Sequence, residues 1–126
     1  MNSDRRRFGL FHNEPNTRHY ARGSEVCRQG EPGATMFAVS RGQVAVMLEG
    51  KVVDTLGPDE VFGEMALLDQ STRTATVVAV EDSDLVEIDK TRFYLLVRQN
   101  PHFALQLMQL LSDRLRRANA LYATGR

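Results

Sequence analysis

The sequence predicts a mainly β domain, an antiparallel sandwich or barrel, followed by C-terminal helices. Two observations support this prediction. Between residues 24 and 88, short apolar or alternating runs are separated by turns rich in glycine and proline, which is typical of short antiparallel strands. After residue 90 the apolar residues recur at spacings of three and four, which is typical of amphipathic helices. With 126 residues, of which 42% are hydrophobic, the chain is long enough to bury one core.

The N-terminal stretch, residues 1–21, is expected to be a polar lead-in that is irregular or partly helical. Phe8, Leu10 and Phe11 are its large apolar residues before Tyr20, and we expect them to attach it to the body. The predicted strands then lie around Val26 and at 36–39, 44–48, 52–56, 75–80 and 85–88. The tripeptide 49–51, Glu-Gly-Lys, predicts a tight hairpin between two of them.

Two helices are predicted between residues 91 and 122. A short helix at 91–99 is expected to be capped by Asp89 or Thr91. Asn100 and Pro101 then predict the N-cap and first turn of a second helix, because proline fits the first helical position. The apolar spacing beyond them predicts an amphipathic helix of about five turns.

Composition excludes several classes of protein. Sixteen basic and sixteen acidic residues give a net charge of zero, which argues against broad electrostatic binding to nucleic acid or anionic membranes. No apolar run has transmembrane length, and no signal-peptide core is present. Cys27 is the only cysteine, which excludes an internal disulfide, fits a reducing compartment and predicts a cytoplasmic protein. We expect Cys27 to fill space in a strand, with a reactive thiol as the alternative.

Catalysis has little support in the sequence. His12, His19 and His102 lie far apart, and no H-x-H pair or H-E-x-x-H helix supplies a metal site. The serines lack a G-x-S-x-G elbow, and no phosphate-binding P-loop motif is present. The sequence therefore predicts a non-catalytic protein without a metal.

The segment 62–77, FGEMALLDQSTRTATV, is the most informative part of the chain. Gly63 and Glu64 precede a short helix-forming run, and a polar loop then leads to Arg73, which is expected to open the next strand. A helix N-terminus and an arginine together suit an anionic phosphate, and Glu64 can accept hydrogen bonds from sugar hydroxyls. These groups predict a site for a sugar with one phosphate. The alternative is an amphipathic turn with both charges at the surface.

This segment resembles the phosphate-binding cassette of the cyclic-nucleotide-binding domain family, whose pattern is F-G-E-x-A-L, a loop, and R-x-A-x-V. The nine positions from Glu64 to Arg73 match the common family spacing. Residues 29–39 and 41–46 resemble the early turn and strands of the family, and the resemblance covers about residues 22–120. It implies one domain, 1–126, with an antiparallel jelly roll (β-roll) at 22–90, the cassette at 62–77 and lid helices at 91–122.

The resemblance also implies roles for individual residues. Arg73 would bind the phosphate, together with backbone N–H groups near Ala66 and Thr74. Glu64 would accept from the ribose 2′-hydroxyl, and Gly63 would allow the tight entry into the helix and contact the ribose.

Contacts to the base are expected from Met65, Thr74 and a side chain of the last helix, Leu121 or Tyr122. Core packing is the alternative for Met65, and a simple strand role for Thr74. Arg114 and Arg117 are alternative lid contacts. A threonine after the arginine permits cGMP, and we place cAMP only slightly ahead of it.

Two positions depart from the family pattern. Thr72 stands where a proline often precedes the arginine, which predicts a more mobile loop, and no clear helix opens the chain. The predicted function is a regulatory sensor for cAMP or cGMP, with no other cofactor, that signals by moving its C-terminal helices. The alternatives are an interaction module with a degenerate pocket, or a truncated transcription regulator or channel domain. Expected partners are another protein, an output domain of a longer parent chain, or a second copy bound through the last helix, but not nucleic acid.

Overall fold

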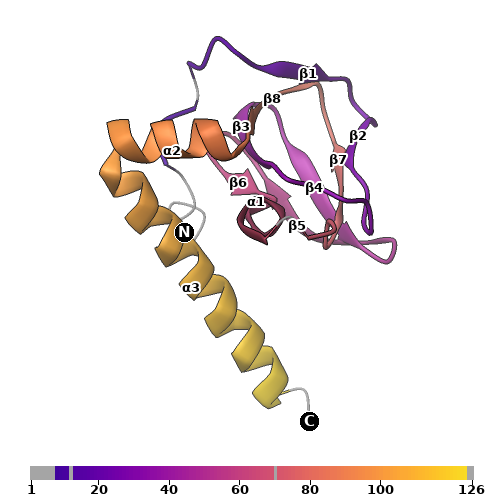
Figure 1. Cartoon of the computed structure of the whole chain (residues 1–126). Coiled ribbons are helices and arrows are strands. Elements are labelled where there is room, and N and C mark those ends of the chain that lie inside the picture. Colours follow the sequence, from indigo (N-terminus) through magenta and orange to yellow (C-terminus); the bar gives the residue numbers. More distant parts are fainter. Residues whose placement is uncertain (1–7, 12, 70, 125–126) are drawn as a thin grey trace.

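The computed structural model describes residues 8–11, 13–69 and 71–124, with residues 121–124 as backbone only. Figure 1 shows a β-roll with helices packed against it, the last of which is long and runs beyond the roll. The roll consists of two four-stranded antiparallel sheets, with strand orders β1-β8-β3-β6 and β2-β7-β4-β5. The strands are β1 (Arg18–Tyr20), β2 (Glu25–Cys27), β3 (Met36–Arg41), β4 (Val44–Leu48), β5 (Lys51–Leu56), β6 (Val61–Phe62), β7 (Thr76–Ala79) and β8 (Ser83–Ile88).

The centre of the first sheet is buried on both faces. Strand β3 shows this most clearly, because five consecutive residues, Met36 to Ser40, are buried. Side chains alternate between the faces of a strand, so Phe37 and Val39 point into the space between the sheets. Met36 and Ala38 point to the opposite face and pack under the helices. One strand therefore belongs to two cores, which explains its continuous apolar run.

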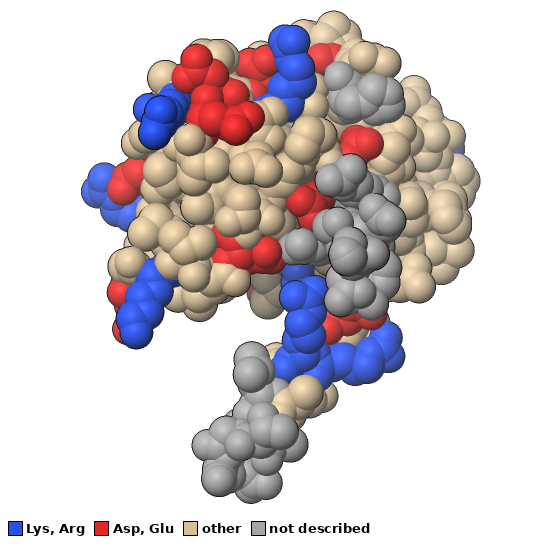
Figure 2. Space-filling model, turned by 180° about the vertical axis from the view of Figure 1, so that it is seen from behind, with Lys and Arg blue, Asp and Glu red and all other residues tan. Residues whose placement is uncertain are grey.

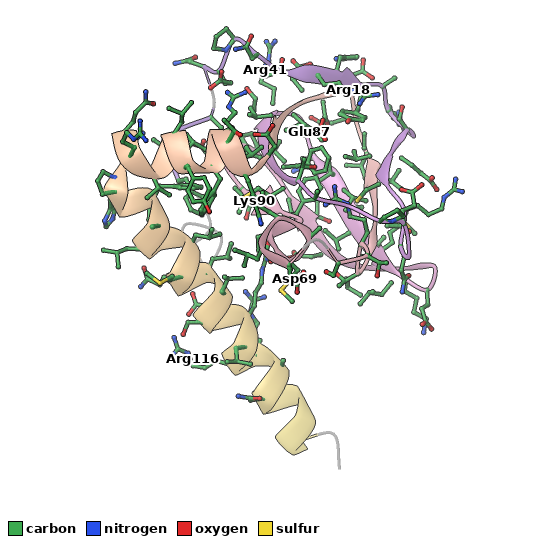
Figure 3. The ribbon with its side chains drawn as sticks, in the orientation of Figure 1. Arg18, Arg41, Asp69, Glu87, Lys90 and Arg116 are labelled. Atoms are coloured by element: carbon green, nitrogen blue, oxygen red, sulfur yellow. The ribbon has the colours of Figure 1, made fainter. Side chains whose placement is uncertain are left out.

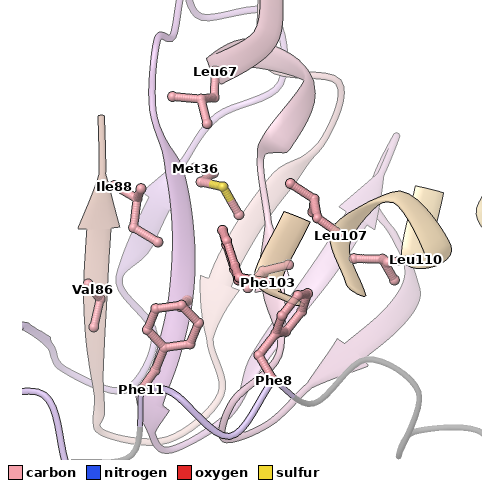
Figure 4. Packing of buried hydrophobic residues seen from close by; sticks show 11 residues of the cluster. Phe8, Phe11, Met36, Leu67, Val86, Ile88, Phe103, Leu107 and Leu110 are labelled. Carbon is pink, nitrogen blue, oxygen red and sulfur yellow. The ribbon is translucent and has the colours of Figure 1, made fainter. Parts of the chain in front are cut away.

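The second core joins the N-terminal segment to the helices. Phe8 and Phe11 pack against Phe103, with ring centroids 5.2 and 6.2 Å from that of Phe103 (Figure 4). Backbone N–H groups of the same two residues donate to Asp59, to its carbonyl and its carboxylate respectively. The predicted attachment of the lead-in through Phe8, Leu10 and Phe11 is thus confirmed, because the partly buried Leu10 also packs against this core.

The helices are α1 (Glu64–Asp69), α2 (Lys90–Gln99) and α3 (Pro101–Thr124). Asp89 caps α2, because its side chain accepts a hydrogen bond from the backbone N–H of Arg92 at 2.8 Å. Helix α3 begins at Pro101 as predicted, but its 24 residues make it longer than the expected five turns. None of the described helices combines the length and apolarity that crossing a membrane requires.

Several boundaries differ from the prediction, and three of the differences concern where a strand lies or begins. Strand β1 lies inside the stretch 1–21 that the sequence suggests is a lead-in, because its three residues pair with β8 despite their polarity. Arg73 does not open a strand, since β7 begins only at Thr76. Strand β8 begins at Ser83, inside the predicted turn, because the Ser83 hydroxyl hydrogen-bonds the backbone of Gln43 and Glu81. In each case tertiary contacts decide where pairing begins.

Candidate ligand-binding site

A cavity of about 460 Å³ lies between the second sheet, α1 and α3. Its walls come from β2, β4, β5, β6, β7, the loop 72–75, α1 and one face of α3. Segments far apart in the sequence therefore meet there: the middle of the roll and the second half of the last helix. Both Glu64 and Arg73 line it, so the alternative of two surface charges on an amphipathic turn is wrong.

Arg73 is buried, with 9% of its surface exposed. Its Nη1 donates to the Thr35 carbonyl at 2.6 Å and its Nη2 to the Thr35 hydroxyl at 3.1 Å. The guanidinium carbon lies 5.3 Å from the centre of the Phe37 ring, close enough for a cation–π contact. Within the described part of the chain, no carboxylate lies within ion-pair distance of Arg73. A buried positive charge therefore faces the cavity without a negative partner.

The backbone around Arg73 is tied to the turn between β2 and β3. Its N–H donates to the Glu31 carbonyl at 2.7 Å, and its carbonyl accepts from the Gly30 N–H at 2.9 Å. Thr72 forms an isolated bridge with Pro32 in the same place. These bonds tie the loop at Thr72, for which the sequence predicts more mobility, to the turn between β2 and β3.

Two glycines make room for the guanidinium. A Cβ on Gly63 would lie 2.9 Å from Arg73 Nη1, and Gly63 also adopts a φ of +82°, which favours glycine. A Cβ on Gly33 would overlap the Arg73 guanidinium itself. The predicted role of Gly63 in a tight entry to the helix is consistent with this conformation.

Glu64, the first residue of α1, is 4% exposed, and only one of its two carboxylate oxygens has a hydrogen-bond partner. Its Oε2 accepts from Arg114 Nη1 of α3 at 2.5 Å, and Arg114 Nη2 donates to the Val61 carbonyl at 3.2 Å. The other oxygen, Oε1, is buried and has no hydrogen-bond partner among the described residues. An unpaired buried carboxylate oxygen is unfavourable, so this atom is suited to a hydroxyl or N–H donor from a ligand.

Comparison with known proteins identifies the family. The model for the cyclic nucleotide-binding domain matches residues 17–100, two thirds of the chain. The chain belongs to the cyclic nucleotide-binding domain family. It is 36% identical over 107 residues to the cyclic AMP receptor protein of Thermus thermophilus, which covers 81% of this chain and 50% of that protein. It is 38% identical over 73 residues to the cAMP-dependent protein kinase regulatory subunit of Eremothecium gossypii, covering 58% of this chain and 16% of that subunit.

Solved structures agree with this assignment. The crystal structure of the Thermus thermophilus catabolite activator protein superposes with a TM-score of 0.77 at 36% identity, covering 86% of this chain and 53% of that one. The predicted family and its mainly β fold with C-terminal helices are therefore confirmed. The chain spans about half the length of the curated relative from Thermus, so it corresponds to one part of that protein.

The cyclic nucleotide-binding domain brings most of the predicted site residues together. Gly63, Met65, Ala66 and Thr74 line the same cavity as Arg73 and Glu64. Ala66 lies in the first turn of α1, where backbone N–H groups lack intrahelical acceptors. The individual binding roles stay predictions. The side chains of Leu121 and Tyr122 lie outside the described residues.

Other cavity residues were not predicted from sequence. Leu48, Val53 and Asp54 reach it from the β4–β5 hairpin, and Ala118 reaches it from α3. Alternation in β5 does not reveal which face meets the cavity, although an aspartate within an apolar strand was a usable signal. Arg114 and Arg117, the alternative lid residues, also line the cavity.

Cys27 ends β2 and lines the cavity as a free, buried thiol. Burial raises the pKa of the Cys27 thiol, and the positive charge of Arg73 opposes this shift only in part. The prediction that Cys27 fills space in a strand is confirmed, because it belongs to the core between the sheets.

Proposed function

We propose that this domain is a sensor that binds cAMP or cGMP in the cavity between the roll and α3. The observation that supports it most is a pair of incompletely satisfied buried groups: Arg73 has no carboxylate partner among the described residues, and one oxygen of Glu64 has no hydrogen-bond partner. A 3′,5′-cyclic nucleotide offers one anionic phosphate and one free ribose hydroxyl, which complement the two groups.

The phosphate is assigned to Arg73. Its guanidinium is held in place by Thr35, so little ordering remains to be done when the anion arrives. Burying a phosphate requires an opposite charge together with aimed donors. Arg73 supplies the charge, and the N–H groups of Ala66 and Thr74 are the proposed additional donors.

The ribose is assigned to Glu64. With Oε2 bound to Arg114, the remaining acceptor for a 2′-hydroxyl is Oε1. A ligand without that hydroxyl leaves Oε1 buried and unpaired, so the site should discriminate against deoxynucleotides.

The choice of base depends on the rest of the cavity. Thr74 is the proposed partner of a guanine, and Met65 and the last turns of α3 are the proposed cover for either purine. Titration with both nucleotides decides whether the site prefers cAMP or cGMP.

The signal is proposed to leave through α3, because Arg114 links that helix to Glu64. Leu105, Met108 and Leu115 are 58%, 57% and 63% exposed on α3, at the spacing of a coiled-coil seam. We propose that this stripe pairs with a second copy or with an output domain. Figure 2 shows charges of both signs interspersed on the visible face of the roll, which supports the expectation that the roll does not bind nucleic acid.

We also propose a regulatory rather than catalytic role, in the cytoplasm and without a metal. The free thiol of Cys27 fits a reducing compartment. No group of three or more His, Cys, Asp or Glu residues within the described ranges is placed to hold a metal ion.

Titration calorimetry with cAMP and cGMP tests the proposal. Wild type should bind at least one of them, and Arg73→Ala should weaken binding by about 2–5 kcal/mol, because the phosphate loses its counter-charge. Arg41→Ala is the matched control, since Arg41 is 78% exposed and pairs with Asp84 away from the cavity (Figure 3). If wild type binds neither nucleotide at millimolar concentration, the domain is an interaction module instead.

A further inference from the structure

A single residue, Thr35, holds both terminal nitrogens of Arg73. Thr35 directly precedes β3, and it offers its carbonyl to Nη1 at 2.6 Å and its hydroxyl to Nη2 at 3.1 Å. The Thr35 hydroxyl also lies 3.1 Å from Glu87 Oε2 on β8. The pairing of β3 with β8 explains this approach, because Phe37 stands opposite Glu87 and Met36 opposite Ile88.

The chemistry of the three groups fixes which of them donates in each hydrogen bond between Arg73, Thr35 and Glu87. A guanidinium only donates, and an ionised carboxylate only accepts. The Thr35 hydroxyl has one proton, so it must accept from Arg73 and donate to Glu87. Glu87 is exposed and lies opposite Phe37, so it stands on the same face of the sheet as Phe37. By accepting the proton of the Thr35 hydroxyl, Glu87 turns a lone pair of that hydroxyl toward Arg73.

We propose that Thr35 and Glu87 are positioning residues that preset the Arg73 guanidinium for its anion. This inference rests on the proposed function, because it assigns Arg73 a phosphate. Neither residue lines the cavity, so neither touches the ligand. They act by fixing the orientation of a long side chain, which would otherwise have to be ordered when the ligand binds.

The remaining contacts of Arg73 do not fix that orientation alone. The Phe37 ring supplies a flat face, and Gly33 and Gly63 pack close to the guanidinium without a side chain. None of these contacts is a hydrogen bond, so none of them selects one orientation of the guanidinium within its plane. The two acceptors on Thr35 select one rotation, and the hydroxyl is the acceptor that a substitution can remove.

Paired variants of Thr35 test the proposal. Thr35→Val keeps the shape and removes the hydroxyl, and Thr35→Ser keeps the hydroxyl and removes the methyl group. We expect Thr35→Val to weaken binding of the preferred nucleotide by about tenfold, the size of one charge-assisted hydrogen bond. Thr35→Ser should stay within about twofold of wild type. Thr55→Val on β5 is the control, because its side chain is exposed and does not line the cavity.

Glu87 and Arg73 complete the binding test. Glu87→Ala should weaken binding less than Thr35→Val, and Glu87→Gln, which can still accept the proton, should restore it. In an Arg73→Lys background, Thr35→Val should weaken binding little further, because the guanidinium that Thr35 holds is already absent. Equal binding by wild type and Thr35→Val, or an equal loss in Thr35→Ser, would overturn the proposal.

A measurement without ligand separates this inference from the proposed function. In ¹⁵N NMR the Arg73 Nε–H signal, identified by its loss in Arg73→Lys, should show a rigid guanidinium in wild type and Thr35→Ser. It should show increased mobility in Thr35→Val. If the signal is equally rigid in Thr35→Val, Thr35 does not position Arg73. If wild type binds neither nucleotide yet the mobility differs as stated, the positioning holds and the proposed ligand is wrong.

Discussion

The carboxylate of Glu64, which opens α1, lies 2.5 Å from the Arg114 guanidinium of α3. The residue proposed to bind the ribose is therefore already bonded to the helix proposed to move. Because only one Glu64 oxygen is used, a ligand hydroxyl can occupy the other without breaking this ion pair. Ligand binding would then favour the arrangement in which α3 is docked. The size of the shift in population depends on how much more tightly the ligand binds the docked than the undocked arrangement.

Arg114→Gln should destabilise the domain by about 1–3 kcal/mol, because it leaves a buried carboxylate with weaker partners. Glu64 is 5% exposed in its side chain, whereas Arg114 is 32% exposed, so the loss falls short of that for a fully buried pair. Chemical denaturation measures it. Arg116→Gln is the control, since Arg116 is 72% exposed and points away from the roll (Figure 3). Equal stability of the two variants would show that the Glu64–Arg114 pair contributes nothing.

Glu64→Ala should remove the discrimination between ribose and deoxyribose. In wild type, a 2′-deoxy analogue leaves Oε1 buried and unpaired, which should weaken its binding by about 1–3 kcal/mol relative to the parent nucleotide. In Glu64→Ala the two ligands should bind alike, because no oxygen remains to be satisfied. Competition binding with both ligands measures the ratio. If wild type binds the deoxy analogue as well as the parent, Glu64 does not bind the ribose.

Gly33→Ala should weaken nucleotide binding by at least tenfold, because its Cβ would overlap the Arg73 guanidinium and displace it. Gly57→Ala is a matched control, since a Cβ there meets its nearest atom, a Glu60 oxygen, at 3.9 Å. Calorimetry of both variants, with their melting temperatures, separates the effect on binding from one on folding. Normal affinity in Gly33→Ala would show that Arg73 has room to move without loss.

Cys27 provides a test that depends on pH. Because burial raises the pKa of its thiol, the thiol stays protonated and reacts slowly at neutral pH, and its rate should increase as pH rises through that pKa. A nucleotide in the cavity should slow the reaction further, since Cys27 lines the cavity. Labelling rates with and without nucleotide measure both effects. A rate that nucleotide leaves unchanged would place the ligand elsewhere.

The raised pKa of the Cys27 thiol also makes the stability of the fold depend on pH. A raised folded-state pKa contributes stability that is complete below the ordinary thiol pKa and is lost as pH rises through the folded pKa. Stability of wild type should therefore fall more steeply at alkaline pH than that of Cys27→Ala, even though the variant loses packing at every pH. Denaturation midpoints across the alkaline range measure the difference in slope, and parallel curves would contradict it.

Much of this molecule could be predicted because local patterns determine it. The strands follow alternation and turn residues, and α3 begins at Pro101 as expected. The shared cavity of Glu64 and Arg73 was predicted because residues 62–77 resemble the phosphate-binding cassette of the family. The partners of these groups could not be predicted, because Thr35 and Arg114 lie 38 and 50 positions away and depend on how separate elements pack. Strand β1 was missed since its polar residues carry no apolar signal.

A crystal structure of the domain with bound cAMP or cGMP tests the central claim most directly. We expect a phosphate oxygen at about 2.7–2.9 Å from an Arg73 guanidinium nitrogen, the distance of a charge-assisted hydrogen bond. We also expect the ribose hydroxyl on Glu64 Oε1. A nucleotide whose phosphate lies away from Arg73, or a cavity that stays empty at saturating ligand, would contradict this account.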